Sequence, residues 1–142
     1  MDKTLKTSIN SQRYYVLMTE QFGRGVYAER KLDKGASIMY CETLPLSQID
    51  TVKVNDTELK HYTFVFDAET NRDCLVLGDG EIFNHSDTPN ARYYLQNLNG
   101  RFLMVFRTTK EIDKDEQIFI DYNADVKESV DVMKEYTTNL VD

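Results

Sequence analysis

Residues 82–90 read Ile-Phe-Asn-His-Ser-Asp-Thr-Pro-Asn, and this short segment directs the interpretation of the whole chain. Asn84, His85 and Ser86 place several hydrogen-bonding groups side by side. Pro89 fixes one φ angle and so stiffens the segment. Taken alone, the segment fits a structural histidine held by hydrogen bonds as well as it fits a ligand-binding turn. Ser86 lies on no nucleophile-elbow pattern, so a serine-hydrolase triad is not supported.

Two further segments carry residues of types suited to ligand binding or catalysis. Residues 22–28 read Phe-Gly-Arg-Gly-Val-Tyr-Ala. Two glycines around one residue let a backbone approach a ligand closely, although a plain turn between strands gives the same pattern. No third glycine and no helix follow, which excludes a dinucleotide-binding fingerprint. Residues 111–123 combine an acidic turn with a strand that ends in Asp121-Tyr122. On its own, Tyr122 is typical of a half-buried core tyrosine.

Short runs rich in Val, Ile, Tyr and Phe recur along the chain and predict a mainly β domain with few short helices. Asn99-Gly100 is a strong hairpin signal and pairs the strands around Tyr93 and Val105. Residues 48–61 are ambiguous, with a short helical turn expected over 57–61. The predicted strands are 14–18, 25–28, 37–40, 62–66, 74–77, 91–95, 101–106 and 117–122. Near the C-terminus an apolar stripe at helical spacing predicts a helix packed on the core (Val126, Val130, Met133, Tyr136 and Leu140).

Size and charge narrow the class of protein. The 142 residues suit one domain, and the formal net charge is −7. This charge argues against a duplex-DNA-binding protein and favours a basic partner. Cys41 and Cys74 belong to no CxxC pair, so we expect no zinc site and two free buried thiols. No apolar run approaches the ~20 residues of a membrane span, and the polar N-terminus resembles no signal peptide. We therefore expect an intracellular, soluble protein, cytoplasmic or nuclear.

Together, and in this order, the three segments resemble the SET-domain protein lysine methyltransferases. The asparagine-histidine-serine-x-x-proline-asparagine motif of that family is intact at Asn84 to Asn90, the glycine-x-glycine entry stands at Gly23 to Gly25, and the acidic turn with its aspartate-tyrosine end stands at Asp115 to Tyr122. The resemblance covers residues 14–123 and is closest to minimal bacterial and viral members. It implies a β-clip fold with a pseudoknot at the C-terminal strand. We expect the polar segment at 1–13 to precede this SET domain, and the helix indicated by the apolar stripe to follow it at 124–142 and pack on it.

The resemblance also implies a reaction. The family transfers a methyl group from S-adenosylmethionine to the ε-amine of lysine, and Tyr122 would be the catalytic tyrosine that orients donor and acceptor. The implied cofactor-binding residues are Phe22, Gly23, Arg24, Gly25, Val26, Asn84 and His85. The implied substrate-binding residues, which line the lysine channel, are Tyr40, Tyr93, Ile120 and Tyr136. Tyr93 together with Ile120 favours mono- or dimethylation.

Several departures from the family pattern bear on these expectations. The cysteine-rich flanks of many members are absent, which again predicts no metal. Asp115 replaces a glycine, and aspartate tolerates a turn. The tyrosine-x-glycine motif is degraded to Met39-Tyr40-Cys41-Glu42. A basic peptide such as a histone tail is the expected partner, without direct nucleic-acid or membrane binding, and a homodimer is a further expectation. The alternative is a SET-fold binding module that transfers no methyl group.

Overall fold

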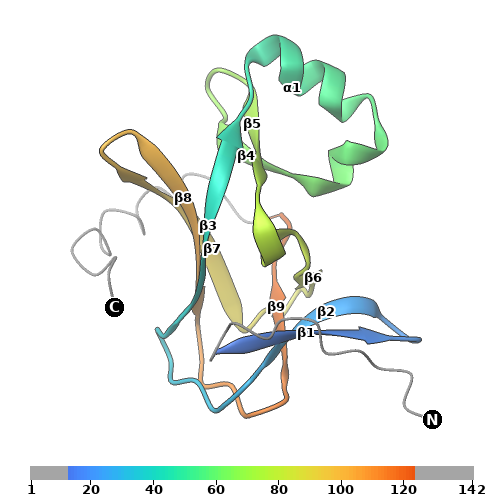
Figure 1. Cartoon of the computed structure of the whole chain (residues 1–142), viewed down its shortest axis with the longest axis vertical. Coiled ribbons are helices and arrows are strands. Elements are labelled where there is room, and N and C mark those ends of the chain that lie inside the picture. Colours follow the sequence, from blue (N-terminus) through green and yellow to red (C-terminus); the bar gives the residue numbers. More distant parts are fainter. Residues whose placement is uncertain (1–12, 124–142) are drawn as a thin grey trace. The chain divides into compact units, whose positions relative to one another are not determined.

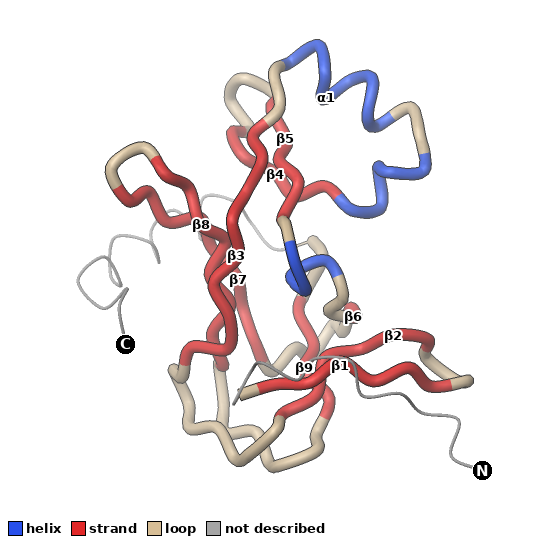
Figure 2. Tube along the Cα trace, in the orientation of Figure 1, coloured by secondary structure: helices blue, strands red, loops and turns tan. Residues whose placement is uncertain are grey.

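Two β-sheets form the framework of residues 13–123, the part of the chain that this computed structural model describes (Figure 1). Helical segments are few and short, and strands dominate the trace (Figure 2). The described residues form two compact units. Unit 1 contains residues 13–39, 82–93 and 105–123, and unit 2 contains residues 40–81 and 94–104. The prediction of a mainly β chain with few short helices is confirmed.

The strands lie close to their predicted positions. In chain order the elements are β1 (Tyr14–Thr19), β2 (Gly23–Ala28), β3 (Ser37–Pro45), α1 (Gln48–Asn55), a 3₁₀ turn (Glu58–Tyr62), β4 (Thr63–Asp67), β5 (Arg72–Val76), a 3₁₀ turn (Gly78–Glu81), β6 (Asn84–His85), β7 (Ala91–Leu98), β8 (Arg101–Thr108) and β9 (Gln117–Ile120). Strand β3 is longer than predicted, whereas β9 ends before Asp121 and Tyr122.

The first sheet lies within unit 1 and has the order β1-β2-β9-β6. Strand β9 pairs antiparallel with β2, with Val26 opposite Ile118, and parallel with β6, with His85 opposite Ile120. Parallel neighbours cannot be joined by a tight turn, and the chain between β6 and β9 includes the whole of β7 and β8. The pairing therefore brings the segment around His85 beside the C-terminal strand, as the pseudoknot expectation requires.

The second sheet has the order β4-β5-β3-β8-β7. Its β7–β8 hairpin turns at Asn99 and Gly100, whose φ angles are 55° and 90°. Positive φ at both turn positions matches the right-handed twist of the flanking strands. The predicted hairpin is confirmed.

A dense apolar cluster forms the core of unit 1. Phe83 and Phe106 are fully buried, and their rings stack with centroids 4.5 Å apart. Ile118 and Ile120 of β9 are completely covered, as is Val26 of β2. Alternate residues of β9 thus anchor it to the core, which fixes the register of the segments that flank it.

Unit 2 contains the region that the sequence left ambiguous. Helix α1 begins after Ser47, whose side chain accepts a hydrogen bond from the Asp50 N–H group (3.1 Å). The buried Thr51 side chain accepts from the Asp73 N–H group (3.0 Å), which ties the helix to β5. The predicted helical turn over 57–61 is confirmed by the 3₁₀ turn. Helix α1 was not predicted because polar contacts, rather than an apolar stripe, hold it in place.

Both cysteines are buried in unit 2 and are free thiols, as predicted. Burial raises the pKa of the Cys41 thiol to about 11 and that of the Cys74 thiol to about 12. Both side chains are therefore protonated and unreactive near neutral pH.

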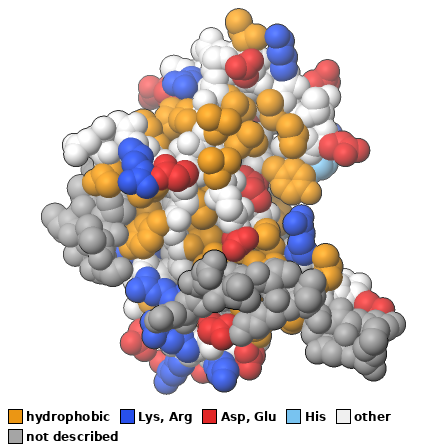
Figure 3. All heavy atoms as spheres, in the orientation of Figure 1, with side chains coloured by type: hydrophobic (Ala, Val, Ile, Leu, Met, Phe, Trp, Pro, Cys, Tyr) orange, Lys and Arg blue, Asp and Glu red, His pale blue; other side chains and the backbone are white. Residues whose placement is uncertain are grey.

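An apolar face remains exposed on unit 2. Leu44 and Leu75 are directly paired across β3 and β5, so their side chains share one face of the sheet. Leu44 and Leu77 are about half exposed, and Figure 3 shows apolar side chains gathered over this part of the molecule.

The predicted C-terminal helix, including Tyr136, lies outside the described residues, as does most of the N-terminal polar segment. Within residues 13–123, no helix is long and apolar enough to cross a bilayer.

Asp115 offers a test of the acidic turn. Its φ angle is +66°, and its carboxylate accepts a hydrogen bond from the Tyr15 hydroxyl (2.9 Å). Asp115→Ala and Asp115→Gly both remove this bond, but only glycine adopts positive φ without cost. Urea denaturation should therefore find Asp115→Ala about 1 kcal/mol less stable than Asp115→Gly. Equal stabilities of the two variants would show that the turn carries no backbone strain.

Glu81 gives a pH-dependent prediction. Burial raises the pKa of its carboxyl group to about 7, although the carboxylate accepts the Val76 N–H group (2.9 Å). The folded-state pKa is above that of the unfolded chain. The contribution of the protonated Glu81 carboxyl group to the free energy of unfolding is therefore complete below about pH 4.3, and it is lost as pH rises through about 7.

We expect wild type to lose about 1–2 kcal/mol relative to Glu81→Gln between about pH 5 and pH 8, allowing for screening of a partly exposed group. Urea unfolding of both proteins at each pH measures this difference. If wild type and variant keep a constant stability difference across that range, the burial of Glu81 has no such effect.

Candidate active site

The centre of the candidate site is the place where β6 lies against β9. Asn84 is opposite Phe119 and His85 is opposite Ile120, and the Ser86 N–H group donates to the Ile120 carbonyl (3.0 Å). Tyr122 follows β9 by two residues. The parallel pairing therefore brings the histidine motif and the aspartate-tyrosine end together within unit 1.

Asn90, the last residue of the motif, locks the two segments. Its side-chain Nδ2 donates to the Gln117 carbonyl (2.9 Å), and its Oδ1 accepts from the Phe119 N–H group (2.8 Å). The side chain thus replaces a strand neighbour along one edge of β9. Asn90 is buried, so the loss of either bond would leave buried polar groups unpaired. We did not predict this role for Asn90, although its place in the motif was a signal for it.

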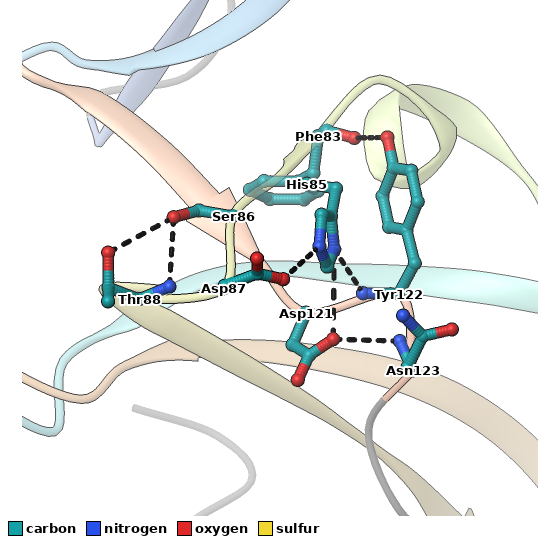
Figure 4. A network of polar contacts seen from close by, with 8 residues as sticks. All are labelled: Phe83, His85, Ser86, Asp87, Thr88, Asp121, Tyr122 and Asn123. Carbon is teal, nitrogen blue, oxygen red and sulfur yellow. Dashed lines mark hydrogen bonds and ion pairs between the residues drawn. The ribbon is translucent and has the colours of Figure 1, made fainter.

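Tyr122 is held at both ends. Its hydroxyl group donates to the Phe83 carbonyl (2.5 Å), and its backbone N–H group donates to Nδ1 of His85 (3.0 Å) (Figure 4). Its ring centroid lies 5.2 Å from that of His85. Tyr122 is nevertheless 55% exposed. It is therefore not the half-buried core tyrosine that the sequence around it, taken alone, predicts. An accessible aromatic group with a fixed hydroxyl can orient a second molecule.

The contacts of His85 determine its tautomer. Nδ1 accepts the Tyr122 N–H group, so in the neutral ring the proton is on Nε2, which donates to the Asp87 carboxylate (2.9 Å). Asp121 lies 3.7 Å from Nδ1, beyond hydrogen-bonding distance. Both ring nitrogens are therefore occupied, and the ring acts on the position of Tyr122. The remaining hydrogen-bonding groups of His85 belong to its backbone.

The glycine-containing segment forms the start of β2. Gly23 has φ of +66°, a conformation that suits glycine. Among residues 13–123, β2 pairs with β9 at Val26 and Tyr27, which leaves residues 23–25 without a strand partner on that edge within this part of the chain. A Cβ at Gly25 would lie 2.7 Å from Gln117 Oε1 and 3.1 Å from Asn84 Nδ2. The absence of a side chain at Gly25 therefore lets these two amides lie against the strand.

The predicted channel residues are in different environments. Tyr93 of unit 1 is half-buried, and burial, with a smaller contribution from the charge of Asp121, raises its pKa to about 12. Ile120 is fully buried in the core. Tyr40 is half-buried in β3 of unit 2, and Tyr136 lies outside the described residues. Their roles in substrate binding stay predictions.

Unit 1 therefore gathers most of the predicted site. It contains the glycine segment, Asn84, His85, Tyr93, Ile120 and Tyr122. Sequence reasoning assigned no role to Phe83, Asp87 and Gln117, which contact these residues, or to Asn90, which bonds the backbone of β9. Phe83 acts through its carbonyl group, which no sequence pattern reports. Gln117 contacts Asn84 only because β9 and β6 are neighbours.

Comparison with known proteins identifies the family and the fold of this chain. The sequence pattern of the SET-domain family matches residues 23–123. A histone-lysine N-methyltransferase of Schizosaccharomyces pombe, specific for histone H3 lysine-37, is 30% identical over 105 residues, which are 73% of this chain and 69% of the relative. An H3 lysine-36-specific enzyme of Eremothecium gossypii is 31% identical over 120 residues, which are 78% of this chain but only 17% of the relative.

Solved structures extend the comparison to the fold. A candidate histone methyltransferase of Plasmodium falciparum has a TM-score of 0.64 at 26% identity, covering 81% of this chain and 96% of that one. CpSET8 from Cryptosporidium has a TM-score of 0.66 at 18% identity, covering 79% and 58%, and at that identity it shows the fold alone. The matched family pattern, the curated relatives and the shared fold agree, and the chain belongs to the SET-domain family of lysine methyltransferases.

Proposed function

We propose that this protein transfers a methyl group from S-adenosylmethionine to the ε-amine of a lysine in a basic protein. The observation that carries the proposal is the accessible Tyr122, whose hydroxyl is fixed on the Phe83 carbonyl and whose backbone is fixed on His85. Methyl transfer needs mainly positioning, because the protein itself forms no bond. The fixed hydroxyl group of Tyr122 would orient the amine.

The residues around β2 and β6 fit the cofactor. Residues 23–25 of β2 have no partner in β9, and the Arg24 carbonyl in this stretch accepts from Asn84 Nδ2 (3.0 Å). Both amide hydrogens of Asn84 are used within unit 1, by the Arg24 carbonyl and by Gln117, which leaves its Oδ1 to accept a hydrogen bond from the cofactor's ammonium group. The backbone of residues 22–26 would hold the remainder, together with the backbone of His85, while the Val26 side chain is fully covered in the core. When bound, the sulfonium supplies an electrophilic methyl group.

The substrate lysine must be neutral to attack. At pH 7 this deprotonation costs about 4–5 kcal/mol for an ordinary lysine. Bound S-adenosylmethionine would supply the methyl group and its thioether would be the leaving group, so the one proton released in each turnover would be the proton that the lysine ammonium loses before it attacks. Burial raises the pKa of Tyr93 to about 12, and its phenol is protonated at neutral pH, as that of an ordinary tyrosine is.

A histone tail is the substrate class that we propose. The net charge of −7 favours a lysine-rich peptide, and the curated relatives are named as enzymes of histone H3. This substrate would make chromatin the place of action.

Replacement of Tyr122 by phenylalanine tests the proposal. Loss of the hydroxyl should lower kcat about 100-fold or more, because a positioned polar group at the reacting atoms is removed. Binding of S-adenosylmethionine should change less than about threefold. Transfer of labelled methyl groups to core histones, with calorimetry of cofactor binding, measures both quantities.

Tyr62→Phe is the matched control, because Tyr62 is a partly exposed tyrosine of unit 2. It should keep full activity. Wild type that binds the cofactor but labels no lysine in histones, basic peptides or native lysate would instead favour a binding module.

His85 gives a second prediction. In His85→Asn the amide oxygen can occupy the place of Nδ1 and accept the Tyr122 N–H group, whereas in His85→Gln the amide reaches the place of Nε2 and leaves that group without its acceptor. We expect the Tyr122 amide to exchange with solvent about tenfold faster in His85→Gln than in His85→Asn, and kcat to follow the same order. Nuclear magnetic resonance and the methyl-transfer assay measure these effects. Equal behaviour of the two variants would contradict the role of Nδ1.

A further inference from the structure

The orientation of the Asn84 amide is chemically determined. Its Nδ2 lies 3.0 Å from the Arg24 carbonyl oxygen, and a carbonyl can only accept a hydrogen bond. The opposite orientation of the amide would place two oxygens against each other. The atom facing the Arg24 carbonyl is therefore the nitrogen Nδ2, and Oδ1 is the atom of the amide on the side away from this carbonyl.

Gln117 occupies the second hydrogen of the same nitrogen. Its Oε1 accepts from Asn84 Nδ2 at 2.8 Å. Since Nδ2 can only donate, the orientation of the Gln117 amide is determined in turn. Gln117 is opposite Tyr27 in the β2–β9 pairing, so its backbone is held by the sheet and its position does not depend on the side chain of Asn84.

Gly25 leaves the room that this pair of amides needs. A Cβ there would meet Gln117 Oε1 at 2.7 Å and Asn84 Nδ2 at 3.1 Å. The contact between the two side chains is thus part of the packing of β2, β6 and β9, and all three strands belong to unit 1.

We propose that Gln117 is a positioning residue, which fixes the Asn84 amide so that Oδ1 faces the amino-acid part of S-adenosylmethionine. This inference rests on the proposed function, because it assigns a role at the same cofactor site. With both amide hydrogens engaged, Asn84 presents only an acceptor, and the cationic ammonium group is the donor of the cofactor that such an acceptor binds most strongly. Without the Gln117 acceptor, the single hydrogen bond to the Arg24 carbonyl does not fix the rotation of the Asn84 amide.

Binding calorimetry with two probes tests the role of Gln117. S-adenosylhomocysteine carries the amino-acid group, whereas methylthioadenosine carries the adenosine and the sulfur without it. Gln117→Met keeps the length of the side chain and removes the acceptor. It should weaken S-adenosylhomocysteine about tenfold, the effect of one lost charge-assisted bond, and leave methylthioadenosine within about twofold.

Gln117→Glu is the rescue variant, because a carboxylate oxygen can accept from Asn84 Nδ2. It should bind S-adenosylhomocysteine within about threefold of wild type. Gln48→Met makes the same chemical change in α1 of unit 2 and should alter neither affinity.

The outcomes separate the two proposals. If wild type binds neither probe, the proposed function fails. If wild type binds both but Gln117→Met weakens them equally, or weakens neither, Gln117 is not a positioning residue while the proposed function stands. Failure of Gln117→Glu to restore affinity also contradicts the inference, provided that its thermal unfolding matches wild type.

Discussion

The placement of β9 between an antiparallel and a parallel neighbour is the constraint on which unit 1 depends. One edge pairs with β2, and the other is satisfied by β6 and by the side chain of Asn90. Because alternate residues of β9 are fully buried, a shift of one residue would expose Ile118 and Ile120. Core packing thus fixes the strand register, and the register determines where Tyr122 emerges.

The polar groups of the site are also oriented step by step, each by a group that is already fixed. Carbonyl groups and backbone N–H groups, which have no alternative hydrogen-bonding state, set the orientation of side chains that do. The Arg24 carbonyl orients the Asn84 amide, and the Tyr122 N–H group selects the tautomer of His85. Each side chain then presents one defined group outward. Such preorganisation lowers the entropy lost when a donor and an acceptor are brought together.

Much of the fold was predictable from local patterns. The alternation of apolar residues located most strands, and Asn99-Gly100 located a hairpin, because both signals act between near neighbours in the chain. Asp115 illustrates a finer success, since its tolerance of a turn is matched by φ of +66°. Helix α1 escaped prediction because Thr51 and Ser47 hold it by polar contacts, one of them to β5, rather than by an apolar stripe.

The sequence by itself determined the residue types of the site. Its motifs identified Asn84, His85 and Tyr122 and indicated the family, because the order and spacing of the motifs are visible in the linear sequence. Only the tertiary structure decided which groups these residues use. The imidazole faces Asp87 and the Tyr122 backbone, and Gln117 was recognised only when β9 lay beside Asn84. The physical reason is that hydrogen bonds between residues distant in sequence depend on strand pairing, and the parallel pairing of β6 with β9 leaves no local signal.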